Sequence, residues 1–248
     1  MRRLTLGGHN TNPIWSHDGQ RIIFRSDDGG LFWQRADGSS AAKRLTTPEK
    51  GVLHSAEAAS PVENVITLTA SGAGGGIWAL SLDDLKLKSL IPNPPVGLIR
   101  HAVFSPDGHW LAYQSNAGGG TPQIYVQPFP STSPPYQITQ TGTNFFPLWS
   151  PDGKQISYLS GGGTARINSV EVRTQPSFDW GKPVSLPIQI YNPGGPGRGG
   201  RNYDILPNGN QFITPLPAAD AQSGDLPSLQ INTVLNWFSE LKQKVPLK

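Results

Sequence analysis

Short apolar runs joined by Asp-Gly turns recur along this chain. Residues 13–24, 102–113 and 147–158 align without gaps, and each contains an apolar run, a Ser-x-Asp-Gly turn and a second apolar run. Residues 203–214 keep the two apolar runs and the turn Gly, with Leu in place of Ser and Asn in place of Asp. Such a turn predicts a tight β-hairpin, because Gly accepts a positive φ and the Asp side chain bonds the nearby backbone. The residues that we interpret as structural turn residues are Asp18, Gly19, Asp107, Gly108, Asp152, Gly153, Asn208 and Gly209.

The spacing of these copies indicates a repeat. They begin 89, 45 and 56 residues apart, so a further copy is expected near residue 63, where residues 60–68 fit and Asn64 stands in the place of the turn Gly. A serine follows the second run of four copies, at Ser26, Ser71, Ser115 and Ser160, which are 45, 44 and 45 residues apart. Internal repeats of 40–45 residues with four short strands each are typical of the blades of a β-propeller.

The sequence therefore predicts an all-β fold, a β-propeller of about five four-stranded blades. The repeats lie near residues 1–47, 48–91, 92–139, 140–187 and 188–235. Apolar side chains run together in the strands, as at residues 22–24, which fits a sheet that is buried on both faces. The fifth repeat lacks a last strand, and we expect residues 3–6 to supply it and close the ring. A short C-terminal helix and tail are predicted over residues 236–248, and a piece of a six-bladed ring is the alternative.

Composition excludes several classes of protein. Gly (29) and Pro (24) favour turns, while the absence of Cys excludes a disulfide scaffold and Cys-ligated zinc. The formal net charge is only +3 and the basic residues are not clustered, so nucleic acid is not an expected partner. No apolar stretch is long enough to span a membrane. The first residues lack the apolar core of a signal peptide. We expect a monomer without cofactor or metal.

No catalytic constellation is found in the sequence, so we predict a protein that is not an enzyme. The Gly-x-Ser-x-Gly, His-Glu-x-x-His and Walker motifs are absent, and five histidines are scattered. Residues 195–200 match the letters of a dinucleotide fingerprint, but a predicted strand follows them where a helix is required. A hydrolase or lyase acting in the central channel stays an alternative. It requires converging carboxylates or histidines on the innermost strands, which offer Asp204, with His101 and Arg201 where those strands begin.

One rim of the predicted propeller carries irregular Gly-rich loops, and the other carries the tight turns. The loops are residues 27–30, 72–76, 116–121 and 161–164, with a longer excursion over 215–228. Loops on a rigid fold are where binding usually resides. Our hypothesis is that this rim binds a protein or peptide, with Arg198, Arg201 and Tyr203 near the channel mouth, because Arg and Tyr are enriched in binding hot spots.

The repeated motif also carries a family resemblance. Trp-Ser-Pro-Asp-Gly-Lys-x-Ile at residues 149–156, with Leu-Thr ending the preceding strand, resembles the WD-like repeat of TolB-type propellers. Residues 234–244 are similar to the end of TolB-like propellers that follow the kinase domain in some bacterial serine/threonine protein kinases. The resemblance implies a protein-interaction or sensing module without catalytic residues. It also implies the alternative of a fragment of a larger receptor kinase or transport-associated protein. The location would be periplasmic in a longer exported protein and cytoplasmic otherwise.

Overall fold

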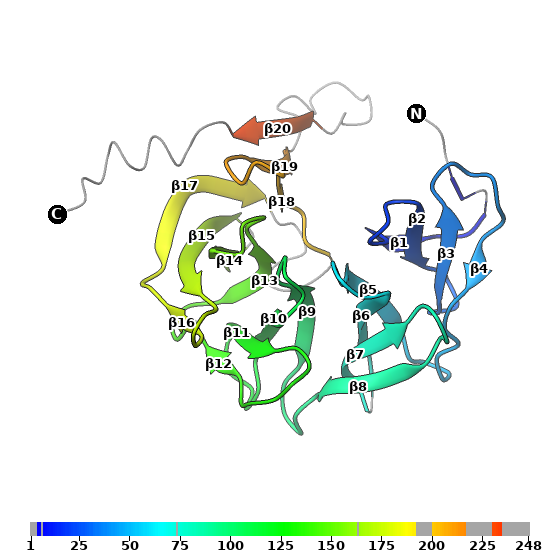
Figure 1. Cartoon of the computed structure of the whole chain (residues 1–248), viewed down its shortest axis with the longest axis horizontal. Coiled ribbons are helices and arrows are strands. Elements are labelled where there is room, and N and C mark those ends of the chain that lie inside the picture. The colour runs from blue at the N-terminus through cyan, green and yellow to red at the C-terminus, as the bar shows by residue number, and fades with distance from the viewer. Residues whose placement is uncertain are drawn as a thin grey trace. The chain divides into compact units, whose positions relative to one another are not determined.

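The protein is built from β-strands. The computed structural model describes residues 4–5, 7–72, 74–162, 164–191, 200–216 and 230–234. All the secondary-structure elements in these residues are β-strands, and the strands form five antiparallel sheets (Figure 1). The all-β prediction is therefore confirmed. The chain divides into two compact units, Met1–Thr141 and Gly142–Lys248, and each is described by itself.

The first unit contains three four-stranded sheets, in each of which the strands pair in chain order. The first sheet is made of β1 (Thr11–Trp15), β2 (Arg21–Arg25), β3 (Leu31–Arg35) and β4 (Lys43–Arg44). The second is made of β5 (His54–Ala59), β6 (Val65–Ala70), β7 (Gly76–Ser81) and β8 (Leu87–Pro92). The third is made of β9 (Ile99–Phe104), β10 (Trp110–Ser115), β11 (Gln123–Pro128) and β12 (Tyr136–Gln137).

The second unit contains a fourth and a fifth sheet. The fourth consists of β13 (Asn144–Trp149), β14 (Gln155–Gly161), β15 (Thr164–Arg173), β16 (Asp179–Trp180) and β17 (Val184–Tyr191). Strand β15 pairs with β16 at its end and with β17 nearer its start, so two segments share the place of the last strand. The fifth sheet consists of β18 (Asp204–Ile205), β19 (Phe212–Leu216) and β20 (Gln230–Val234).

Two predictions about the chain ends stay predictions. Closure by residues 3–6 would join the two units, and only Leu4 and Thr5 of that segment are described. Within the first unit, the Leu4 carbonyl accepts a hydrogen bond from Nε2 of Gln34, at 3.2 Å. The helix predicted over 236–248 lies outside the described residues.

The Ser-x-Asp-Gly turns are closed by the same hydrogen bonds in each copy. At Asp152, one carboxylate oxygen accepts from the Ser150 hydroxyl at 2.6 Å and from the Lys154 amide at 3.1 Å. The Ser150 hydroxyl oxygen accepts from the Gln155 amide, at 2.9 Å. The turn glycines Gly19, Gly108, Gly153 and Gly209 have φ of 64°, 73°, 70° and 71°. These turns need glycine because a Cβ is disfavoured in that left-handed conformation.

The turn of the second sheet is built differently from the prediction. Asn64 does not have a positive φ, so it does not replace the turn glycine. The Ser60 hydroxyl accepts from the Glu63 amide at 3.1 Å, and Nδ2 of Asn64 donates to Oδ1 of Asp83 at 2.6 Å. A wider, side-chain-bonded turn therefore joins β5 to β6.

The cores lie between sheets and bury the apolar runs. Ile23 and Leu31 of the first sheet cluster with Leu68 and Leu80 of the second. The second and third sheets are also joined by a buried hydrogen bond from the Thr67 hydroxyl to the Ala102 carbonyl, at 3.0 Å. The second unit has its own cluster, whose buried members are Phe145, Phe146, Leu159, Ala165, Ile167, Leu186, Ile188, Ile190, Tyr203 and Phe212.

The turn geometry predicts the effect of a single methyl group. A Cβ at Gly19 would meet no atom within 4 Å, so Gly19→Ala tests the backbone conformation alone. We expect the free energy of unfolding to fall by about 1–2 kcal/mol, measured by urea denaturation. Gly120 is the control, because its Cβ site is equally open and its φ is not positive. Equal effects of Gly19→Ala and Gly120→Ala would contradict the prediction.

Candidate functional site

The first strand of four sheets carries a bulge at the same place. The pairing register shifts between Thr11 and Ile14 in β1, between Ala56 and Ala58 in β5, opposite Ala112 to Gln114 in β9, and between Phe145 and Leu148 in β13. The residues at the bulges are Asn12, Glu57, His101 and Phe146. A bulge leaves its extra residue unpaired in the ladder and re-aims its side chain. The repeat therefore presents one side chain per sheet at an equivalent position.

Three of these bulge residues have an unusual backbone conformation. Asn12, His101 and Phe146 have φ of 53°, 57° and 55° without being glycine. Such residues are uncommon and costly unless the surrounding structure holds them in place. These three residues are 89 and 45 residues apart, one or two repeat lengths, so the conformation belongs to the repeat, although the bulge at Glu57 lacks it.

In the first unit the bulges bring a carboxylate and an imidazole together. Strand β5 contacts both β1 and β9, so the bulges of neighbouring first strands are adjacent. Nδ1 of His101 lies 3.2 Å from Oε2 of Glu57. The other carboxylate oxygen, Oε1, accepts from the Thr69 hydroxyl at 2.7 Å. Only 11% of the His101 side chain and 12% of the Glu57 side chain are exposed.

This pair is suited to proton transfer. A carboxylate that bonds one ring nitrogen holds an imidazole in a fixed orientation, as in catalytic Asp-His pairs. His and Glu are also the side chains most often used as general acids and bases. Strand β5 is also bonded to the first sheet, because Nη1 of Arg25 donates to the Ser55 hydroxyl at 2.8 Å. In the described residues no group of three or more His, Asp or Glu side chains could hold a metal ion.

Sequence reasoning found only half of this pair. His101 was placed where a strand begins, whereas it lies inside β9 at the bulge. Glu57 was missed because the second repeat lacks the Asp-Gly turn, so its first strand could not be located. The 44-residue spacing from His101 back to Glu57 is the signal that could have identified it.

The rim of Gly-rich loops carries exposed aliphatic side chains in the first unit. We call Leu53, Val96 and Leu98 the rim patch; between 43% and 60% of each is exposed. Leu53 and Leu98 are equivalent, because each precedes a first strand and pairs with the loop that follows a second strand. Leu53 bonds Ser71 and Leu98 bonds Asn116 in this way.

Glycines in the neighbouring loops make room for these side chains. A Cβ at Gly29 would lie 2.9 Å from Cδ2 of Leu53, and a Cβ at Gly119 would lie 3.2 Å from Cγ1 of Val96. Both glycines also have positive φ, at 81° and 84°. The glycines of this rim therefore serve packing as well as turn geometry.

The three predicted binding residues have different outcomes. Arg198 lies outside the described residues. Tyr203 is buried in the core of the second unit, where its hydroxyl donates to the Phe146 carbonyl at 2.6 Å, and burial raises its pKa. Its ring is therefore a packing element rather than a surface contact. Arg201 is partly exposed, and its Nε donates to the Tyr203 carbonyl at 3.0 Å, so its binding role stays a prediction.

The other histidines lie apart from the pair. His9, His17 and His109 are exposed in loops and turns. His54 is buried at the start of β5, where Nδ1 lies 3.0 Å from the Thr46 hydroxyl, and burial lowers the pKa of the imidazole.

No helix in the described part of the chain is long and apolar enough to cross a membrane.

Comparison with known proteins shows the fold. No protein-family model and no curated protein matches the chain. Among solved structures, TolB from Acinetobacter baumannii is 21% identical over 90% of this chain, with a TM-score of 0.66. The chain spans 51% of that protein. The β-propeller prediction is thus confirmed, with a TolB-like arrangement of sheets.

Enzymes share this fold likeness. An oligogalacturonate lyase from Vibrio parahaemolyticus is 10% identical, with a TM-score of 0.61; the match covers 94% of this chain and 65% of the lyase. A puromycin-hydrolyzing peptidase from Mycobacterium tuberculosis is 19% identical, with a TM-score of 0.62; the match covers 94% of this chain and 39% of the peptidase. Identities this low show the fold and leave activity open.

Burial of His54 predicts how stability depends on pH. Because its pKa is lower in the folded protein, the unfolded chain binds more protons once the pH falls below about 6.5, so stability decreases there. We expect His54→Asn to reduce the difference in free energy of unfolding between pH 7.5 and pH 5.5. The control is His109→Asn in an exposed turn, which should leave that difference unchanged. An unchanged difference in His54→Asn would contradict the prediction.

Proposed function

We propose that this protein is a TolB-like β-propeller module that binds a protein or peptide at its loop rim and has no enzymatic activity. The carrying observation is the rim patch, three aliphatic side chains that are exposed on loops of one rim of the first unit. Exposed apolar side chains that gather on one surface mark interaction sites. A wider role in a longer receptor kinase or transport-associated protein belongs to the same proposal, since the chain spans about half of the TolB that it matches.

The construction of the rim supports binding by a preformed surface. Leu53 and Leu98 are fixed by backbone hydrogen bonds to Ser71 and Asn116. A partner would therefore meet side chains that are already held in place, which lowers the entropic cost of association. Gly29 lies against Leu53 and Gly119 lies against Val96, so these two loop positions place no side chain over the patch.

The rim patch predicts the effect of adding charge. A phage-displayed peptide library is selected against the immobilised protein, and the affinity of the selected peptides is measured by fluorescence anisotropy. We expect Leu53→Asp with Leu98→Asp to weaken binding at least tenfold, because each buried Leu contributes about 1.5–3 kcal/mol. The control is Val62→Asp with Leu85→Asp, two exposed positions on the opposite, tight-turn side. Equal losses in the two double variants, or no selected peptide, would contradict the proposal.

A second candidate function is a hydrolase or lyase that acts at Glu57 and His101. The favouring observation is that these two side chains converge on neighbouring first strands, which is the requirement set for channel chemistry. The lyase and the peptidase that share the fold are consistent with it. In this candidate His101 moves a proton and Glu57 orients its ring, because the carboxylate faces Nδ1.

This candidate predicts a loss of activity on conservative substitution. The protein is assayed for hydrolysis of chromogenic esters, anilides and glycosides. It is also assayed for the formation of unsaturated products from uronides. If activity is present, Glu57→Gln and His101→Asn should each lower kcat about 100-fold or more, since acid–base catalysis supplies roughly 10²–10⁴. Glu63→Gln, an exposed carboxylate on the adjoining turn, is the control. Activity that survives both substitutions would exclude the pair as the catalytic centre.

A further inference from the structure

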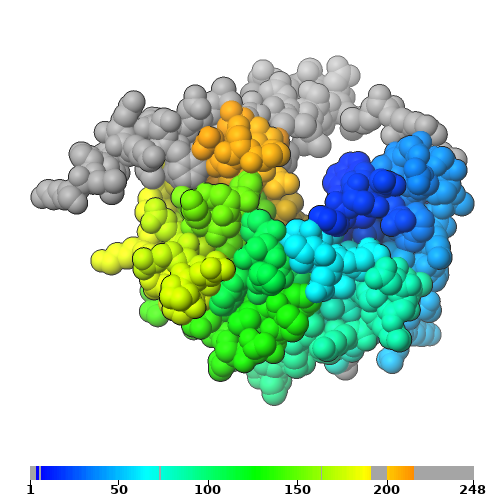
Figure 2. Space-filling view, in the orientation of Figure 1, coloured from blue at the N-terminus to red at the C-terminus, as the bar shows by residue number. Residues whose placement is uncertain are grey.

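A pocket of about 470 Å³ lies between the first and second sheets, within the range of ligand-binding pockets. The two sheets share a buried core, and in the space-filling view they are the blue and the cyan parts of the molecule (Figure 2). The wall from the first sheet includes Arg21, Trp33 and Lys43. The wall from the second sheet includes Leu82 and Asp83. Both walls belong to the first unit.

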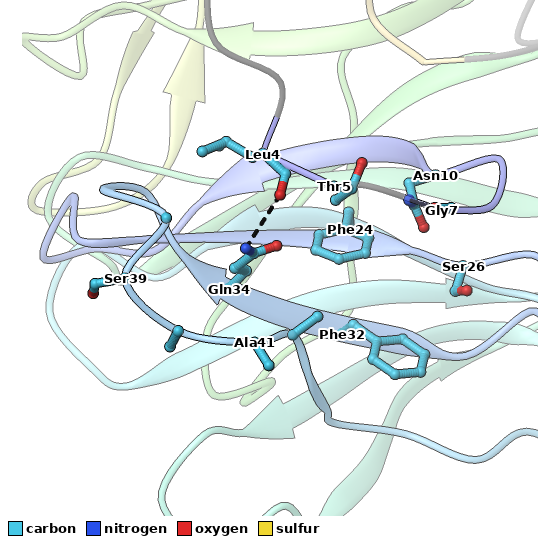
Figure 3. Close-up of a pocket in the computed structure, with 13 residues that line it drawn as sticks. Leu4, Thr5, Gly7, Asn10, Phe24, Ser26, Phe32, Gln34, Ser39 and Ala41 are labelled. Atoms are coloured by element: carbon cyan, nitrogen blue, oxygen red, sulfur yellow. Dashed lines mark hydrogen bonds between the residues drawn. The ribbon is translucent and has the colours of Figure 1, made fainter.

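The pocket is on the face of the first sheet that packs against the second sheet. Side chains alternate between the two faces of a strand, and Ile23 pairs with Trp33 across β2 and β3, so these two share a face. Ile23 is buried in the core that the first and second sheets share. Phe24, Phe32 and Gln34 lie on the opposite face, which Figure 3 shows. The pocket is therefore formed entirely within one compact unit.

The repeat explains why a space is left at this place. Leu82 and Phe129 are equivalent, because each follows the third strand of its sheet and donates its amide to the residue before the second strand. The acceptors are the carbonyls of Asn64, at 2.8 Å, and His109, at 2.7 Å. Phe129 packs into the core between the second and third sheets, where its ring lies 5.1 Å from that of Phe104. A leucine in the same position leaves the corresponding space beside the first sheet partly unfilled.

The wall from the first sheet is aromatic and cationic. The guanidinium of Arg21 lies over the ring of Trp33, 4.7 Å from its centroid. Its Nε is buried without a hydrogen-bond partner among the described residues, and Nη1 lies 3.7 Å from the Asp18 carboxylate, beyond hydrogen-bond distance. Lys43 pairs with Trp33 across β3 and β4, is exposed, and forms no ion pair in the part of the chain that the structure describes. Both cations can therefore take an acceptor from a ligand.

The wall from the second sheet supplies a carboxylate. Oδ1 of Asp83 accepts from Nδ2 of Asn64 at 2.6 Å, whereas Oδ2 has no hydrogen bond with any residue that the structure describes. The neighbouring Asp84 is already paired with Lys86, whose Nζ lies 2.8 Å from its Oδ2. Asp83 is therefore the carboxylate of this wall that can take a donor from a ligand.

The two walls and the floor between them define the chemistry of the occupant. The floor is aliphatic, since Ile23 and Leu45 line the pocket and are buried. A ligand with one charge would leave one wall unpaired, whereas a ligand with a charge of each sign and an apolar body would pair with both walls. The volume suits a ligand larger than a single amino acid.

We propose that this pocket binds a short apolar peptide whose two ends are both free. Its α-carboxylate pairs with Arg21 and Lys43, and its α-ammonium pairs with Asp83. One of its apolar side chains lies against Trp33. The pocket contains no residue of the rim patch and takes a small ligand instead of a protein surface, so this inference goes beyond the proposed function and can hold or fail separately.

Calorimetric titration of the full chain with the dipeptide Leu-Phe tests the proposal. We expect saturable binding with a Kd below about 1 mM. Acetylated Leu-Phe lacks the ammonium group and amidated Leu-Phe lacks the carboxylate, so each should bind at least fivefold more weakly. Absent binding of Leu-Phe, or equal binding of the free and the two blocked dipeptides, would overturn the proposal.

Two charge-removing variants assign each end of the dipeptide to a wall. Lys43→Met keeps the aliphatic stem, and Asp83→Asn keeps an oxygen for Asn64; each should weaken Leu-Phe binding at least fivefold. Lys43→Met should leave binding of the amidated dipeptide unchanged, because that ligand has no carboxylate to lose. Lys88→Met and Glu63→Gln are the controls, exposed positions that do not line the pocket. Unchanged binding in both pocket variants, or an equal loss in the controls, would contradict the assignment.

Filling the space tests the location independently of charge. Leu82→Phe introduces the side chain that Phe129 has in the third sheet, so it should weaken Leu-Phe binding at least tenfold without lowering the midpoint of urea denaturation. Peptides selected on the rim patch should bind this variant as they bind the natural chain. A folded Leu82→Phe protein that binds Leu-Phe unchanged would overturn the proposal. If this variant does not fold, Lys43→Met and Asp83→Asn still decide the question.

Discussion

The hydrogen-bonded Ser-x-Asp-Gly turn is the constraint on which the described sheets depend most. It fixes which residue of the first strand faces which residue of the second, for example Trp149 opposite Ile156. A slip of one residue would exchange the two faces of the strand. Because these sheets bury apolar side chains on both faces, such a slip would mismatch two packing layers at once. A turn of a few polar atoms thus determines the packing of many apolar ones.

The bulges in the first strands have the opposite effect on the pairing register. The turn establishes a common register, whereas the bulge interrupts it and takes one side chain per sheet out of the ladder. The fold pays for this with positive φ at Asn12, His101 and Phe146. At the Glu57–His101 pair, two repeats contribute one group each to a nearly enclosed pair.

Much of the fold was predictable because turn chemistry is local. The apolar run at residues 22–24 was predicted to lie in a strand and lies within β2, and the copy predicted at residues 60–68 contains the turn that joins β5 to β6. The second hairpin was harder, because Ser60 and Asn64 replace the Asp-Gly signal with side-chain bonds that depend on Asp83, a residue distant in sequence. The burial of Tyr203 was hard to predict for a related reason. A tyrosine beside arginine suggests a surface, and only the packing of Phe146 and Phe212 shows that its ring is enclosed.

The contact between rim glycines and rim aliphatic side chains has a consequence for how this protein can change. Leu53 rests on Gly29, and Val96 rests on Gly119, so each of these loops is shaped by a residue of another loop. Replacing a glycine alone pushes an aliphatic side chain aside, while replacing the aliphatic residue alone leaves a flat, empty place. New specificities on this rim would therefore arise through paired substitutions of a glycine and the aliphatic residue that lies against it.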